Sequence, residues 1–143
     1  MGTFKIDADQ FQWINGPEDD PNDLCLHGHV MVQVGTNSFD DDGTVSATAL
    51  YLLKSLKEDK IMNRCDIQMI PCCGHFLIAN ADRSEVTISS CDTGTDWSVI
   101  HSDGGIKIVL PSGVEEQLDF ADYKAEVFRF ADKVEAYYKS CQP

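Results

Sequence analysis

The sequence is poor in positive charge and has no long apolar run. Its 143 residues carry 11 Lys and Arg against 24 Asp and Glu, a formal net charge of −13. Such a surface repels nucleic acid and anionic lipid, because both are polyanions. No stretch of about 18 apolar residues exists that would span a bilayer. We therefore expect neither nucleic acid nor a membrane as a partner.

We also expect no secretory signal. The first residues, MGTFKIDADQF, include acidic side chains and lack the apolar core of a signal peptide. We therefore expect a cytoplasmic protein. In that compartment the default state of the six cysteines is the reduced thiol.

Motifs of catalysis are missing as well. The chain has no Gly-x-Ser-x-Gly elbow, no phosphate-binding loop and no dinucleotide fingerprint. Cys72 and Cys73 lie close to His75 in the sequence, but a base must meet its thiol in space before the thiol becomes a nucleophile. No residue is predicted to be catalytic, and a non-enzymatic protein is favoured.

The length is that of one domain, so residues 1–143 are expected to form a single fold. Residues 25–35 alternate between polar and apolar side chains, which indicates a half-buried strand. Residues 45–58 and 121–140 place apolar residues at helical spacing and predict two helices. In the second of these, Glu126 and Arg129 can pair at i, i+3.

Between the two helical segments, short apolar or alternating runs are separated by turn sequences of hairpin length. Short connections require antiparallel neighbours. The sequence therefore predicts an α+β domain, with a twisted antiparallel β-meander packed against two helices. The expected strands are 75–81, 85–91, 96–102, 105–110 and 115–120.

Two acidic stretches, 15–23 and 38–43, combine carboxylates with turn formers and are predicted to be surface loops. They offer a route to a basic protein partner, because opposite charge accelerates encounter. Trp97 is a candidate anchor if it is exposed, or a core residue under the C-terminal helix. The candidate partner-binding residues are thus Asp19, Asp20, Asp40, Asp41, Asp42 and Trp97.

Thiols and imidazoles occur in two groups, CLHGHV and PCCGHF. If the groups met, they would supply the four ligands of a zinc site, drawn from His27, His29, Cys72, Cys73 and His75. The spacing opposes this interpretation, because structural zinc sites favour Cys-x-x-Cys or His-x₃₋₅-His. The alternative is packed cysteines and hydrogen-bonded histidines, with no cofactor.

The segments DLCLHGHV, ATALYLLKSL, PCCGHF and GTDWSVIHSDGG together resemble a family of small bacterial proteins without a characterised activity. The acidic α+β chain is also similar, more loosely, to immunity proteins that neutralise polymorphic bacterial toxins. That likeness implies a non-enzymatic inhibitor of a basic toxin or nuclease, and it assigns no residue a role. Two functions therefore stay open: an acidic protein-binding module, and a structural or hydrolytic zinc domain.

Overall fold

The computed structural model describes residues 2–13, 26–62, 68–72, 76–79, 81–84, 86–89 and 94–141. Its elements, in chain order, are β1 Phe4–Gln12, β2 His27–Val34, β3 Asn37–Thr44, α1 Val45–Lys54, β4 Phe76–Ala79, β5 Val86–Ser89, β6 Ser98–Ser102, β7 Gly105–Val109, β8 Glu115–Asp119 and α2 Phe120–Cys141. These elements form an α+β single-domain fold, which confirms the predicted fold class.

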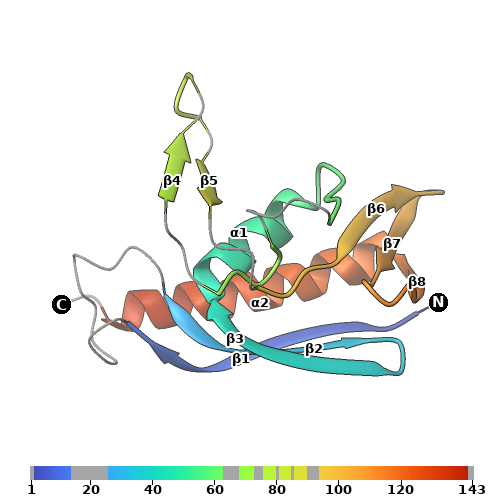
Figure 1. Ribbon diagram of the computed structural model, residues 1–143, viewed down its shortest axis with the longest axis horizontal. Coiled ribbons are helices and arrows are strands. Elements are labelled where there is room, and N and C mark those ends of the chain that lie inside the picture. The colour runs from blue at the N-terminus through green and yellow to red at the C-terminus, as the bar shows by residue number, and fades with distance from the viewer. Residues whose placement is uncertain are drawn as a thin grey trace.

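The N-terminal strands form an antiparallel sheet of order β1-β2-β3 (Figure 1). Val30, Val32 and Val34 of β2 are buried, while the residues between them face outward, so the predicted alternation is confirmed. A two-residue turn joins β2 to β3, and Gly35 takes the positive φ of 60° that suits the first central position of such a turn.

Strand β3 corrects one prediction, because the stretch 38–43 is not a loop. Residues 37–44 pair with β2 over their whole length, with Val32 opposite Phe39 and Val30 opposite Asp41. The turn formers in this stretch suggested a loop, but strand preference depends on what a segment packs against. Here the neighbouring valine-rich strand decides the outcome.

The remaining strands form two further sheets rather than one continuous meander. Strands β6, β7 and β8 make a three-stranded antiparallel meander, and β4 pairs with β5 in a separate two-stranded sheet. These five strands overlap the five segments predicted from the sequence. Figure 1 shows α2 running behind both three-stranded sheets, which places a single long helix across most of the molecule.

Helix α1 is shorter than predicted and ends at Lys54 instead of residue 58. The hydroxyl of Ser55 donates to the carbonyl of Leu52 at 2.5 Å and lies 2.6 Å from the hydroxyl of Tyr123. A serine hydroxyl bonded to the carbonyl three residues earlier offers the backbone an alternative to further helical hydrogen bonds. Within the described ranges, neither helix combines the length and apolar character needed to cross a membrane.

Helix α2 follows its prediction closely. Tyr123, Val127, Phe130 and Val134 are buried in one stripe, and the carboxylate of Asp119 accepts hydrogen bonds from the first-turn N–H groups of Ala121 and Asp122. The predicted ion pair of Glu126 with Arg129 is present, and Glu135 pairs with Lys139 at i, i+4 as well. Apolar burial on one stripe and a capped first turn explain why this segment is helical.

The core lies between the sheets and the helices, and Trp97 is at its centre. This side chain is 0% exposed and contacts the rings of Phe4 and Phe39, with centroid distances of 6.4 and 5.7 Å. The role of Trp97 as a surface anchor is therefore wrong, since a fully buried ring touches no partner. Its alternative, a core residue, is correct.

Candidate functional site

The outer face of the N-terminal sheet carries a groove of about 730 Å³, which we call the outer-face groove. Side chains from all three strands and from α2 line it. The lining residues are Lys5, Ile6, Asp7, His29, Met31, Val32, Gln33, Ser38, Phe39, Asp40, Glu126 and Arg129. Met31, in the middle strand, is 36% exposed and supplies an apolar element among polar neighbours.

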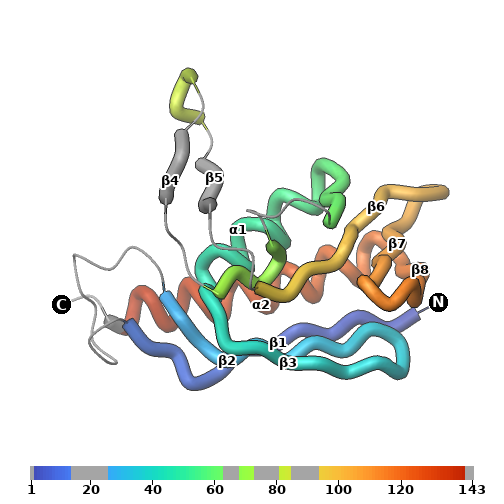
Figure 2. Tube along the Cα trace, viewed as in Figure 1, coloured from blue at the N-terminus to red at the C-terminus, as the bar shows by residue number. Residues whose placement is uncertain are grey.

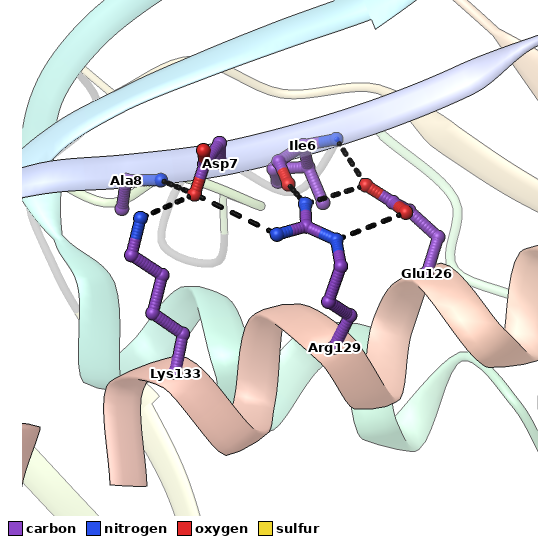
Figure 3. A network of polar contacts seen from close by, with 6 residues as sticks. All are labelled: Ile6, Asp7, Ala8, Glu126, Arg129 and Lys133. Atoms are coloured by element: carbon purple, nitrogen blue, oxygen red, sulfur yellow. Dashed lines mark hydrogen bonds and ion pairs between the residues drawn. The ribbon is translucent and has the colours of Figure 1, made fainter. Parts of the chain in front are cut away.

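One side of the groove is closed by side chains of α2 bound to the edge of β1 (Figure 3). Glu126 Oε1 accepts a hydrogen bond from the N–H of Ile6 at 3.0 Å, and Arg129 Nη2 donates to the carbonyl of Ile6. The same guanidinium binds Glu126, with Nη2 2.7 Å from Oε1. The Glu126–Arg129 ion pair thus supplies the hydrogen bonds that a neighbouring strand would make at this edge of β1. We call these contacts of α2 with β1 the α2 clamp.

Two further contacts extend the α2 clamp along β1. Lys133 Nζ donates to Asp7 Oδ1 at 2.8 Å, and Arg129 Nη1 lies 3.8 Å from the same oxygen. Burial opposes ionisation of Asp7, but the bond from Lys133 and the nearby cations outweigh it and lower its pKa. Burial likewise opposes ionisation of Glu126, and the bonds from Arg129 and Ile6 outweigh it, so this pKa is lowered too.

At the opposite side of the groove, His29 lies between two carboxylates. Its Nδ1 is 2.6 Å from Asp42 Oδ1, and its Nε2 is 2.8 Å from Asp40 Oδ2. The hydrogen bond with Asp42 is the main cause that raises the pKa of His29, and the charge of both aspartates adds to it. Because an imidazole donates from both nitrogens only when protonated, this geometry favours the imidazolium ion.

The charge balance differs between the two sides. At the α2 clamp, Asp7 and Glu126 face Arg129 and Lys133, so anions and cations match. Along β3, the ion pairs of Asp40 and Asp42 within the described structure are with His29 alone. These aspartates are 62% and 86% exposed, so the β3 side carries excess negative charge that solvent and partners can reach.

The other candidate partner-binding residues are placed differently. Asp41 has the opposite orientation to its neighbours and accepts a hydrogen bond from the Thr95 hydroxyl at 2.6 Å, so it ties β3 to the chain that follows residue 94. Asp19 and Asp20 lie outside the residues that the structure describes, as does the predicted loop 15–23. Of the three consecutive aspartates, Asp40 and Asp42 therefore form the accessible pair.

Only some of the candidate metal ligands lie close together. His27, His29 and Cys72 line a hollow of about 230 Å³ together with Asp42. However, both ring nitrogens of His29 are bound to aspartates, and Cys72 belongs to a disulfide. In the part of the chain that the structure describes, no three potential ligands are arranged to hold a metal ion. Cys73 and His75 lie outside that part.

The disulfide at Cys72 also corrects the prediction of six reduced thiols. A sulfur in a disulfide offers no thiolate, and a thiolate is the form of cysteine that binds zinc. Cys72 is therefore not available as a ligand in this oxidised form.

Sequence reasoning missed the α2 clamp and the groove beneath it. A signal for β1 was present in the sequence, because residues 4–9 alternate as Phe-Lys-Ile-Asp-Ala-Asp. In the structure Phe4, Ile6 and Ala8 are buried. Lys5 and Asp7, between them, line the groove. No local signal shows that Glu126 and Arg129 bind Ile6, since they follow it by 120 and 123 positions in the chain.

Comparisons with family profiles, curated protein sequences and solved structures found no match.

Proposed function

We propose that the protein is a non-enzymatic binding module for a basic protein partner, which it engages through the β3 side of the outer-face groove. The supporting observation is the exposed pair Asp40 and Asp42, whose charge is offset only by His29 among the residues described. The net charge of −13 adds long-range attraction for a cationic partner. An immunity-type inhibitor of a basic toxin or nuclease belongs to this class.

The contact surface fits such a role physically. Charged groups on an interface mainly set the association rate and the choice of partner, while apolar groups in the centre hold the complex. Here the charged pair lies at the rim, and the partly exposed Met31 lies inside the groove. Trp97 is excluded from this contact by its burial.

The test is capture of a basic protein from the native lysate at low salt, followed by its identification, purification and reconstitution with this protein. We expect the dissociation constant to rise steeply with salt, because exposed charge pairs are screened over about 10 Å at 0.1 M ionic strength. The double variant Asp40→Asn/Asp42→Asn should bind about tenfold more weakly or worse.

A matched control removes the same charge elsewhere. Asp103 and Asp132 are exposed, on the β6–β7 turn and on α2 respectively, and neither lines the groove. The variant Asp103→Asn/Asp132→Asn should bind with an affinity close to that of the parent protein. Equal weakening by both double variants would mean that net charge, and not this site, governs binding.

Zinc binding is the alternative function, supported by the hollow that His27, His29 and Cys72 share. It requires a reduced Cys72, so metal content should be measured by elemental mass spectrometry before and after reduction in the presence of zinc. Stoichiometric zinc that is lost in His27→Ala would favour this alternative, and so would a stability that depends on the metal.

A further inference from the structure

Among the residues that the structure describes, the lateral edges of the two three-stranded sheets are covered, with one exception. The edge of β1 is bound by the α2 clamp. At the edge of β6, the backbone of Val99 exchanges two hydrogen bonds with the backbone of Lys60. At the edge of β8, the carbonyl of Gln117 accepts a hydrogen bond from the N–H of Gly2. Covering of this kind is expected, because an open edge presents unpaired N–H and C=O groups.

Strand β3 is the exception along much of its length. Alternate residues of an antiparallel strand direct their backbone groups to opposite sides. Thr44 directs its N–H away from β2 to the carbonyl of Pro71 at 2.7 Å. Ser38, Asp40 and Asp42 have the same parity, so their backbone groups also point away from β2.

No backbone partner for these three residues occurs in the ranges that the structure describes. All three are exposed. Figure 2 agrees, because the end of β3 near the β2–β3 turn runs along the lower border of the molecule with no segment drawn below it. We call Ser38–Asp42 the open edge.

We propose that the open edge binds an extended segment of the basic partner as a fourth strand, with Lys or Arg at every second position of that segment. This inference rests on the proposed function and specifies how the partner is recognised. The backbone of the open edge supplies the hydrogen bonds, and the side chains of Asp40 and Asp42 supply the selection for charge.

The spacing of the two aspartates sets the pattern of the segment. Residues i and i+2 of a strand lie about 6.5–7 Å apart on the same face. Cationic side chains two residues apart on an added strand therefore reach Asp40 and Asp42 in register. The residues between them face the side of Phe39, which is only partly buried, so β-branched residues suit those positions.

The same charges argue against a second copy of this chain as the occupant. Pairing β3 with β3 across a two-fold axis would bring Asp40 and Asp42 of one copy near the aspartates of the other. Like charges opposite each other destabilise a pair of strands. The charge of the open edge therefore opposes pairing with a second copy of this chain and favours pairing with a cationic strand.

The experiment uses an acetylated, amidated peptide of alternating Lys and Val, which we call the Val peptide, and a control peptide of the same sequence in which every backbone nitrogen is methylated. Both carry the same charge, but the methylated peptide has no backbone N–H group to donate to a neighbouring strand. Hydrogen exchange of single backbone amides is followed by NMR in the full-length protein. We expect the Val peptide at saturation to slow exchange at Ser38, Asp40 and Asp42 by about tenfold or more, and the methylated peptide to leave it unchanged.

Phe39 and Asp41 provide an internal reference, because their amides already point toward β2 and should be protected without peptide. The variant Ser38→Pro removes one outward N–H and keeps every charge, so it should weaken binding of the Val peptide. Proline is tolerated at this kind of edge position, where the N–H has no internal partner.

Three outcomes would overturn strand addition. The first is equal binding of both peptides without new protection, and the second is protection confined to another edge. The third is binding of neither peptide while the reconstituted basic partner still binds. In the first and third cases the acidic binding module would stand without strand addition, whereas failure of every basic probe and partner to bind would refute the proposed function itself.

Discussion

At the scale of single residues, His29 has the clearest consequence. Asp40 and Asp42 face the imidazole of His29 from β3. Asp9 is the register partner of His29 on β1, and His27 lines the adjoining hollow. A protonated His29 cancels one of the two β3 charges, while a neutral His29 leaves both. The protonation of one imidazole therefore sets how much negative charge a partner meets at the rim of the groove.

The raised pKa of His29 predicts a specific dependence of stability on pH. A group whose pKa is raised on folding stabilises the protein fully below its ordinary pKa of 6.5 and loses that contribution as pH rises through the raised value. We expect the free energy of unfolding to fall above pH 6.5 in the parent protein. In His29→Gln this decline should be reduced, as measured by urea denaturation at several pH values.

A suitable control is Asp132→Asn, which leaves the His29 contacts in place and should keep the decline. If His29→Gln and the parent protein showed the same slope above pH 6.5, the two aspartates would not be binding the imidazolium as the structure indicates.

At the scale of elements, the α2 clamp joins the helix to a strand edge without adding a strand. Glu126, Arg129 and Lys133 follow at spacings of three and four, so they form a polar stripe beside the buried stripe of α2. Bonds to Ile6 satisfy a backbone N–H and a carbonyl that would otherwise face the groove unpaired. The helix thus fixes the position of β1 through both packing and hydrogen bonding.

Arg129→Met should therefore destabilise the protein by about 1–2 kcal/mol, because it leaves Glu126 without its cation and the Ile6 carbonyl without its donor. Lys139→Met is the matched control, since it removes one partner of an exposed i, i+4 pair, and it should change stability by less than about 0.5 kcal/mol. Equilibrium denaturation near neutral pH measures both. Equal effects of the two substitutions would contradict a structural role for the α2 clamp.

Elements with a strong local pattern were predictable from the sequence, and those decided by distant contacts were not. The buried stripe of α2 and the alternation of β2 are repeated over many residues, so the helix and the strand were both identified. The stretch around Asp40 to Asp42 has the local chemistry of a turn, and its strand conformation comes from pairing with β2. At the end of α1, Ser55 contacts the hydroxyl of Tyr123, 68 positions later in the chain, and no local pattern indicates that contact.

The candidate site was predictable only as a list of residues. Acidic side chains at 40–42 were identified, but which of them are accessible follows from strand parity, which a loop would not have. The contact of His29 with Asp40 and Asp42 depends on the register that the Gly35 turn imposes on β2 and β3. The burial of Trp97 depends on Phe4 and Phe39, which lie 93 and 58 positions earlier in the chain.

At the scale of the whole molecule, the disulfide at Cys72 bears on how the fold is held together. Residues 70 and 71 lie against the end of β3, because the Pro71 carbonyl accepts from the N–H of Thr44 and the Ile70 side chain lies close to Gly43. Ile70 also pairs with Thr95. Cys72 follows directly, so its covalent link restrains the chain beside the N-terminal sheet. A cross-link stabilises mainly by reducing the freedom of the unfolded chain.

Reduction should therefore lower the stability of the protein by about 2 kcal/mol or more. Thermal unfolding with and without a thiol reductant measures the change, and Cys72→Ser should unfold at the lower temperature in both conditions. Peptide mapping after alkylation should find Cys72 protected in the untreated protein. A Cys72 that is fully alkylated without reductant would show that the bond does not form.

The sealed edge of β1 also limits how far any assembly can grow. A sheet that grows by repeated addition of molecules, as in a fibril, needs an open edge on each side. Each added molecule then presents an open edge to which the next can pair. This N-terminal sheet has Glu126 and Arg129 bound to one border, leaving a single side for docking. Copies of this chain therefore cannot extend the sheet one after another, because a copy that pairs through its β3 has its β1 edge already bound by α2.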